Sequence, residues 1–363
     1  MKKNLKKIYS SLIKIIFDLI FSKLSVSGEI FFKENVKIDE IKLKPNAKNV
    51  YKIYTINKSR IYSDGSENVA VIKKNFILPK ISIQLNKNYL VESYQNSILK
   101  TGTRKLIQKK IYGNVLSLVQ GVSAVDNYGH WLLDILPKLC ISEKYSNLNN
   151  FDAIYLPSFN KKFQLDSLKY FNIDPKKFID GNIFRHIYAE KFTIPQHPYW
   201  RINKFQLDTV ANIDPDIIFN LRKKFLKSDN NFGNKKLFID RSDSKFFHSQ
   251  IENMDEVLDF LRKNKFEILR LSNFSFEEQI YYFNNAKIII GAHGAGLCNL
   301  IFCKSKTKVI EFSNKDFKCD VFKNISKVND LIYHKLISTS EIPIDKTKPD
   351  IKISIKELNK LIG

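Results

Sequence analysis

The sequence has little of what marks metal sites, disulfide-linked scaffolds or exported proteins. Its four cysteines, at positions 140, 298, 303 and 319, include no pair with the close CxxC spacing of a zinc or redox site. No Ala-x-Ala cleavage site follows the N-terminal segment, which disfavours secretion. We therefore expect free thiols in a reducing compartment, and hence a cytoplasmic protein.

Signatures of nucleic-acid binding are also missing, although the formal net charge is +23. The chain has no arginine-rich tract, no zinc-finger spacing and no aromatic ribonucleoprotein motif. Lysine, asparagine and isoleucine are used heavily throughout the chain. Compositional bias and a membrane-facing surface therefore explain the charge better than a nucleic-acid partner does. We expect no nucleic acid among its partners.

The N-terminal segment lacks the uninterrupted apolar length of a membrane-spanning helix. Within residues 1–25, apolar side chains recur at helical spacing, but Lys14 and Asp18 break the run. Six lysines accompany them, which predicts a basic amphipathic helix. This helix either packs on its own domain or attaches the protein peripherally to the anionic inner face of a membrane.

Length and composition allow two domains, because 363 residues with 44% hydrophobic content can bury two cores. Short apolar runs predict a mostly β section over residues 29–125. Strands then alternate with a helix as far as residue 194, which predicts a parallel sheet. We place one domain at 26–200, a second at 201–335, and a tail at 336–363 that ends in a helix.

Two segments near the domain boundary have ordinary explanations. Residues 196–201 are expected to be an irregular connection, although His197 and Trp200 could line a cleft. Asp214 before Pro215 predicts a capped helix rather than the Asp-x-Asp motif that holds a metal.

The second domain shows the most regular alternation. Strands are predicted over 236–239, 266–271, 288–290 and 308–312, with helices over 253–264 and 276–285. Such a Rossmann-like series binds ligands at the carboxyl ends of its strands. Arg241, His293 and Glu311 fall at or next to such ends. There an arginine can pair with phosphate, and a carboxylate can hold a ribose.

A glycine loop joins the third of these strands to a helix that is predicted to start near Leu297. Residues 286–296 read Ala-Lys-Ile-Ile-Ile-Gly-Ala-His-Gly-Ala-Gly. The glycines let the backbone approach a ligand, and the N–H groups of a first helical turn attract an anion such as a diphosphate. The pattern matches neither a Walker loop nor a dinucleotide fingerprint, so a plain tight turn explains it equally well.

His130 and Asp134 form the other informative pattern. Asp126 or Asn127 can cap a helix that carries both residues four positions apart, hence on one face. A carboxylate that orients a histidine and raises its basicity is what a general base for a hydroxyl group requires. A capped core helix with a satisfied histidine explains the spacing at least as well. Pro137 predicts a kink in this helix.

Several motifs, in this order, together resemble those of glycosyltransferase family 61. They are residues 127–137 (Asn-Tyr-Gly-His-Trp-Leu-Leu-Asp-Ile-Leu-Pro), Arg241 after a strand, Glu278 and Gln279, residues 291–297 with Asn299 and Phe302, and residues 309–312 (Val-Ile-Glu-Phe). The resemblance implies a GT-B-like fold, with two Rossmann-like domains facing a cleft. It also implies inverting transfer from a UDP-linked sugar, such as UDP-xylose or UDP-N-acetylglucosamine. Related bacterial proteins resemble enzymes of surface polysaccharide assembly.

This resemblance gives the two domains and their residues expected roles. Residues 26–200 become the acceptor-side domain for a glycan or lipid-linked acceptor, and 201–335 the nucleotide-sugar-binding domain. His130 is the expected base with Asp134 orienting it, and Asn127, Tyr128 and Trp131 lie on the acceptor side. Glu311 is expected to hold the ribose. The remaining donor-binding residues are Arg241, His293, Gly294, Ala295, Gly296 and Asn299. Because the helix dipole and the arginine supply positive potential, no metal or cofactor is required beyond the nucleotide-sugar co-substrate.

The sequence departs from the family pattern at one place. Family members often carry further arginines before the asparagine that opens the helix at 253, whereas residues 246–250 here are Phe-Phe-His-Ser-Gln. Lys245 or His248 could substitute. If donor binding is lost, the alternative is a non-catalytic, membrane-associated protein that binds nucleotides or polysaccharides. A hydrolase is a poorer alternative, because residues 121–125 lack the second glycine of a nucleophile elbow.

Overall fold

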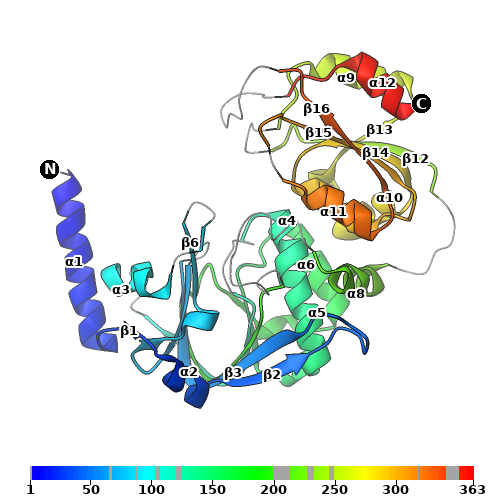
Figure 1. The fold of residues 1–363 in the computed structure, drawn as a ribbon. Coiled ribbons are helices and arrows are strands. Elements are labelled where there is room, and N and C mark those ends of the chain that lie inside the picture. The colour runs from blue at the N-terminus through cyan, green and yellow to red at the C-terminus, as the bar shows by residue number, and fades with distance from the viewer. Residues whose placement is uncertain are drawn as a thin grey trace. The chain divides into compact units, whose positions relative to one another are not determined.

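The structure is a computed structural model that describes residues 2–64, 68–86, 89–90, 92–102, 107–119, 125–198, 213–226, 233–244, 249–317, 319–340 and 351–363. Contacts within the chain divide it into two compact units, Met1–Gln206 (unit 1) and Leu207–Gly363 (unit 2). Each unit combines helices with a sheet, which confirms the predicted α/β class (Figure 1).

Unit 1 is organised around one large mixed sheet. Within its described residues, the strands are β1 (Ser25–Val26), β2 (Lys37–Ile41), β3 (Tyr51–Ser63), β4 (Asn68–Lys73), β5 (Phe76–Ile77), β6 (Ile83–Asn86), β7 (Tyr89–Leu90), β8 (Lys109–Ser117), β9 (Ala153–Leu156), β10 (Phe178–Asp180) and β11 (His186–Pro195). The α-helices described there are α1 (Lys2–Phe21), α2 (Glu29–Asn35), α3 (Ser97–Thr101), α4 (Tyr128–His130), α5 (Leu136–Tyr145) and α6 (Lys162–Leu168).

The sheet of unit 1 has an antiparallel part and a parallel part. Its main path is β1-β5-β4-β3-β11-β8-β9-β10, with β2 paired to β3 and β6 linking β4 to β7. The strands β2, β3 and β4 are antiparallel neighbours, and β3 is also antiparallel to β11. By contrast, β11, β8, β9 and β10 run parallel. The prediction of a Rossmann-like first domain therefore holds only for the parallel part, because the residues before β8 pair mainly as antiparallel neighbours.

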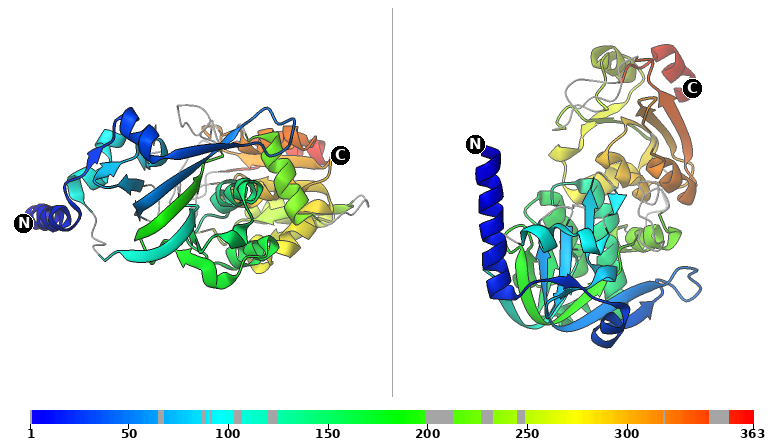
Figure 2. Two further views of the ribbon diagram at one scale, coloured as in Figure 1. Left: turned by 90° about the horizontal axis from the view of Figure 1, so that it is seen from below. Right: turned by 60° about the vertical axis from the view of Figure 1, so that its left-hand side comes forward.

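The predicted N-terminal helix is α1, which lies at the margin of unit 1 (Figure 2). Phe17 on this helix is fully buried in an apolar cluster with residues of β4 and α3. The Arg60 guanidinium lies 4.6 Å from the centre of the Phe21 ring and donates to the Phe21 carbonyl. The C-terminal end of α1 is thereby fixed to unit 1. Of the helices that the structure describes, none is both long and apolar enough to cross a membrane.

Two parallel neighbours in unit 1 bring distant parts of the sequence to one edge of the sheet. After β8 the chain runs through α4, the π-helical segment η3 (Trp131–Ile135) and α5 before it returns to β9. The end of β11 lies beside the end of β8, since Thr193 pairs with Leu116. Because both strands point the same way, the residues that follow residue 117 and those that follow residue 195 start at the same edge.

The sheet of unit 2 is parallel across all its described strands. These are β12 (Lys235–Asp240), β13 (Glu267–Arg270), β14 (Ala286–Ala292), β15 (Lys308–Ser313) and β16 (Ile332–Ile337), in the order β13-β12-β14-β15-β16. The four predicted strands are all present, whereas β16 was not predicted. The chain runs from β12 outward to β13 and then crosses back to β14. In doubly wound sheets, ligands bind at such a reversal, at the carboxyl ends of the strands.

Helices cover both faces of the unit 2 sheet (Figure 1). Those described are α8 (Pro215–Phe225), α9 (Met254–Lys263), α10 (Phe276–Asn284), the 3₁₀ helix η8 (Ala295–Phe302), α11 (Val321–Val328) and α12 (Ile355–Ile362). The pair α9 and α12 contact each other on one face, while α8, α10 and α11 contact η8 on the other. The cap predicted at Asp214 forms, since its side chain accepts a first-turn backbone N–H of α8, and the side chains of Ser275 and Ser354 cap α10 and α12 in the same way.

Candidate functional site

The helix after β8 presents His130 beside Asp134. Asn127 caps its first turn by accepting a hydrogen bond from the His130 backbone N–H. His130 Nδ1 lies 2.9 Å from Asp134 Oδ2. The His130 side chain is 32% exposed, whereas that of Asp134 is 2% exposed. With Nδ1 held by the carboxylate, Nε2 is the ring nitrogen left to meet a substrate.

The backbone that carries this pair is π-helical rather than α-helical. The Leu136 N–H bonds to the carbonyl of Trp131, five residues earlier. Pro137 follows at once and has no N–H with which to continue a regular ladder. The irregularity predicted at Pro137 thus takes the form of a wide turn directly before it. Single π-helical turns often occur at functional sites.

Asp134 has two further ionisable neighbours. His197, in the segment after β11, places Nε2 3.9 Å from Asp134 Oδ2. Lys138 lies one helical turn beyond Asp134 and donates to the Leu118 carbonyl at 2.9 Å. Both side chains are buried. The parallel pairing of β8 with β11 brings together residues 134 and 197 at one edge of the sheet.

The surroundings shift the proton affinities of these groups in different directions. Burial opposes protonation of His130, but the charge of Asp134 and its hydrogen bond outweigh it, so the pKa of His130 is raised above its usual value. Burial, together with the positive charges of Lys138 and His130, holds the pKa of His197 well below its usual value. Burial lowers the pKa of Lys138 to about 8, against the effect of Asp134. The more exposed histidine is therefore the more basic one.

The three residues expected on the acceptor side lie in different surroundings. Asn127 is exposed, and Tyr128 is half-buried with its ring edge-on to Phe163. Trp131 is fully buried, and its indole N–H donates to the Ser167 hydroxyl of α6 at 2.8 Å. Trp131 therefore belongs to the domain that was expected on the acceptor side, but its ring fills the contact between η3 and α6 instead of being exposed.

In unit 2, Arg241 and the glycine loop meet at the switch point between β12 and β14. Arg241 Nη1 donates to the His293 carbonyl. A Cβ on Gly294 would lie 2.5 Å from the guanidinium carbon of Arg241, so the arginine can rest on the loop only because residue 294 is glycine. Gly294, Ala295 and Gly296 are partly exposed. The predicted helix starts at Ala295 and is of the 3₁₀ type. The first backbone N–H groups of this helix and the Arg241 guanidinium together create a region of positive electrostatic potential.

His293 is held from several sides. Its Nδ1 lies 2.5 Å from Glu311 Oε1, and the Tyr333 hydroxyl donates to Glu311 Oε2 at 2.5 Å. The ring centre lies 4.2 Å from that of Phe317 and 4.8 Å from that of Phe322. Burial, and then the Glu311 charge, raise the pKa of Tyr333, which therefore remains a hydrogen-bond donor. The His293 side chain is 12% exposed.

Two predicted donor contacts do not fit this geometry. Glu311 is fully buried, and its two oxygens already bind His293 and Tyr333, so the prediction that it holds a ribose is corrected. Asn299 is also fully buried, and its amide donates to Gln279 and to the Gly296 carbonyl. Both residues instead bind the loop, Glu311 through the His293 ring and Asn299 through the Gly296 carbonyl.

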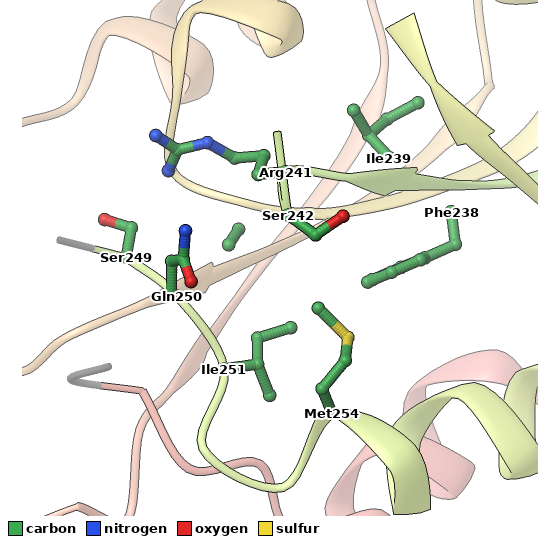
Figure 3. A pocket seen from close by; sticks show the side chains of 9 residues that line it. Phe238, Ile239, Arg241, Ser242, Ser249, Gln250, Ile251 and Met254 are labelled. Carbon is green, nitrogen blue, oxygen red and sulfur yellow. The ribbon is translucent and has the colours of Figure 1, made fainter. Parts of the chain in front are cut away.

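A cavity of about 190 Å³ lies at the carboxyl end of β12 (Figure 3). Its apolar lining comes from Phe238, Ile239, Ile251, Met254 and Ala292, and its polar lining from Arg241, Ser242, Ser249 and Gln250. Residues 246–250 depart from the family pattern, and the last two of them, Ser249 and Gln250, line the cavity beside Arg241. Residues 245–248, and also Trp200, lie outside the described residues.

Sequence reasoning did not connect Lys138, His197 or Tyr333 to these sites. His197 is visible in the sequence as a histidine just beyond a predicted strand, but its approach to Asp134 depends on which strands are neighbours. Tyr333 lies on β16, which was not predicted at all. Lys138 carried a signal that could have been used, because it continues the four-residue spacing of His130 and Asp134.

Comparison with known proteins finds one recognised region that contains the main residues of both sites. Residues 128–310 match the family model described as Glycosyltransferase 61. That range contains His130, Asp134, Arg241 and His293. The matched range comprises half of the chain.

Two plant proteins share part of this sequence. The beta-1,2-xylosyltransferase RCN11 of Oryza sativa subsp. japonica is 30% identical over 131 residues, which cover 32% of this chain and 25% of that protein. A beta-1,2-xylosyltransferase of Arabidopsis thaliana is 33% identical over 66 residues, which cover 18% of this chain and 12% of that protein. The chain thus matches a quarter or less of the length of these relatives.

A solved structure also aligns with this chain. It is the bacterial iron-containing dodecameric glycosyltransferase TibC from enterotoxigenic E. coli, with 10% sequence identity over 82% of this chain and 83% of that chain. The TM-score is 0.28, which is too low to support an argument about the fold.

Proposed function

Because this chain belongs to glycosyltransferase family 61, we propose that it transfers a sugar from a nucleotide-sugar donor to a hydroxyl group of a glycan or lipid-linked acceptor. UDP is the proposed nucleotide, from the family resemblance. The two relatives named as beta-1,2-xylosyltransferases make a pentose one of the first sugars to test. Assembly of a surface polysaccharide is the proposed setting.

The observation that carries this proposal is the pairing of a partly exposed His130 with a buried Asp134 at 2.9 Å. In the proposed inverting reaction, His130 Nε2 takes the proton of the acceptor hydroxyl. The acceptor oxygen then forms a bond to the anomeric carbon, while the bond from that carbon to the diphosphate breaks. Asp134 holds Nδ1 and stabilises the imidazolium that results.

The leaving diphosphate needs positive charge and hydrogen-bond donors. We assign it to Arg241, the Nε2 side of His293 and the first N–H groups of η8, which lie together at the switch point of the unit 2 sheet. Glu311 and Asn299 act here as positioning residues for the loop. These groups supply the charge without a metal ion, so metal-independent transfer is part of the proposal.

The proposed roles of the two parts of the chain follow from these assignments. Residues 26–200 form the acceptor side, and residues 201–335 bind the nucleotide-sugar. The GT-B-like arrangement, with two domains facing a cleft, belongs to the same proposal and rests on the family resemblance.

We also propose that α1 attaches the protein peripherally to an anionic membrane surface at the inner face. Ile8, Leu12, Ile15 and Leu19 are exposed, and Leu19 is 81% exposed. At 100° per residue, these four positions fall within roughly 60° of one another. Phe17 projects from the opposite side and is buried against the rest of unit 1. The helix is therefore apolar on two faces, and the sheet domain covers one of them.

Charge favours a lipid surface as the occupant of the second face. Residues 1–25 contain six lysines and one aspartate. An exposed apolar face on a lysine-rich helix is the usual pattern of a helix that binds an anionic lipid surface.

A thermal-shift panel tests the proposed function most simply. The purified chain would be heated with UDP, GDP, CMP and their sugar conjugates, each with and without EDTA. A ligand that binds the folded state raises the melting temperature, and we expect a selective shift with UDP and UDP-pentoses that EDTA leaves in place. Active donors would then be followed for transfer to glycan acceptors. A nucleotide shift without transfer or donor hydrolysis would support the non-catalytic alternative, and no shift at all would contradict nucleotide-sugar use.

A further inference from the structure

The charge of Asp134 has to be balanced inside unit 1. Its side chain is 2% exposed, and an isolated carboxylate in such a place is strongly unfavourable. Three described ionisable side chains pair with it or respond to its charge: His130, His197 and Lys138. One of these three side chains must carry the positive charge that balances Asp134 before the reaction begins.

Neither histidine suits that role. If His130 were charged at rest, it could not accept a proton from the acceptor. His197 is fully enclosed, and its burial, followed by the positive charge of Lys138, holds its pKa well below the usual value and keeps it neutral. Lys138 is the remaining candidate, and its position suits the role of a cation that balances Asp134. It follows Asp134 by one turn on the same helix face, and its ammonium is held at the Leu118 carbonyl, away from solvent.

We propose that Lys138 is the buried cation that balances Asp134, and that it thereby keeps His130 neutral until His130 takes the proton of the acceptor. This inference rests on the proposed role of His130 as the base. Lys138 touches no reacting atom in this account and is a positioning residue. Its ammonium sets the charge state of the catalytic pair.

The consequence of removing Lys138 follows from the charges. Without that ammonium, Asp134 has His130 as its nearest source of positive charge, so protonation of His130 becomes more favourable. The pKa of His130 then rises, and the neutral base is present only at higher pH. The acid limb of the activity profile should move upward together with the titration of His130. A purely structural role for Lys138 would lower activity or stability without moving that titration.

The test is a histidine NMR titration of the full chain with the substitution Lys138→Met. The chain has six histidines, and His130 is assigned by the signal that disappears in His130→Gln. We expect the pKa of His130 to rise by about one unit or more in Lys138→Met. At a pH below that pKa, transfer falls about tenfold for each unit of the rise. Lys138→Arg keeps the charge and should keep the titration close to that of the natural protein.

A matched control variant and a direct titration of Lys138 complete the test. Lys144 lies on the same helix and is exposed, so Lys144→Met should leave the His130 titration unchanged. If Lys138→Met does not fold, the Lys138 side chain can be titrated in the natural protein and identified by its absence in Lys138→Arg. A proton lost near pH 8 supports the inference, because the group is then charged at neutral pH.

The outcomes separate this inference from the proposed function. An unchanged His130 titration in a folded Lys138→Met variant, or a Lys138 that is already neutral at pH 6, overturns the role of Lys138 and leaves the base assignment standing. Full transfer by His130→Gln overturns the proposed base, whatever the titrations show.

Discussion

Among the residues that the structure describes, each unit pairs a histidine with a buried carboxylate, and the two pairs differ in their surroundings. His130 and Asp134 lie among groups that can change charge, since Lys138 and His197 are their neighbours. In the other pair, the His293 ring contacts two phenylalanine rings, and Glu311 accepts a hydrogen bond from a tyrosine hydroxyl. The side chain of His130 is 32% exposed and that of His293 is 12% exposed.

A histidine paired with a buried carboxylate can thus serve two different tasks. A general base must change its charge during each turnover, so it benefits from a carboxylate whose own charge is balanced by other groups. A group that holds a diphosphate must instead keep a fixed orientation, and aromatic walls together with a doubly bound carboxylate provide that. In our account the first pair handles the acceptor proton and the second binds the donor.

Of the substitutions that test the difference between the two pairs, Asp134→Asn should have the largest effect, and it acts on the rate of transfer. The amide keeps the shape but loses the charge that raises the pKa of His130, so we expect transfer to fall roughly 10²- to 10⁴-fold. The remaining activity should have its acid limb at lower pH, because the pKa of His130 falls. Rates measured across pH check both points. An acid limb that moves upward would contradict the pairing.

Arg241→Ala should weaken donor binding by about 10- to 100-fold, since it removes charge-assisted hydrogen bonds to the diphosphate. Gly294→Ala is the sharper companion variant. Its Cβ would meet the Arg241 guanidinium at 2.5 Å, and the flexible arginine would move away at little cost in stability. Calorimetric titration with UDP should show a similar loss in both variants, and their combination should add little. Full additivity would show that Gly294 does not act through Arg241.

Glu311→Gln should have a smaller effect, about tenfold on donor affinity, because it releases the ring of His293 without removing it. Tyr333→Phe deletes only the hydroxyl that binds the other carboxylate oxygen, and a still smaller change is expected. Neither should alter the pH dependence that His130 sets. If Glu311→Gln moved the acid limb of transfer, the two pairs would not have separate tasks.

Replacing exposed apolar residues of α1 should have the smallest effect on chemistry. Leu12→Ser combined with Leu19→Ser leaves the buried Phe17 face intact, so the fold and the transfer to a soluble acceptor should persist. Sedimentation with phosphatidylserine vesicles should fall several-fold relative to the natural chain. Equal binding by both proteins would mean that this face does not meet the membrane.

The sequence predicted these features unevenly, for physical reasons. Local signals worked well: the periodicity of residues 1–25, the cap at Asp214, and four of the five described strands of unit 2 each depend on neighbours in sequence. Strand pairing is not local, so the approach of His197 to Asp134 could not be predicted. Burial was the other limit. Trp131, Asn299 and Glu311 carry groups that suit substrates, but their enclosure depends on how helices and strands pack around them.

The most direct test measures binding and transfer in one preparation of His130→Ala. Asp134, Arg241 and the glycine loop remain in that variant, while the proposed base is lost. We predict that it binds UDP with the affinity of the natural chain and transfers sugar at least about 10²-fold more slowly. Transfer at the natural rate, in a variant that binds the donor normally, would contradict the account.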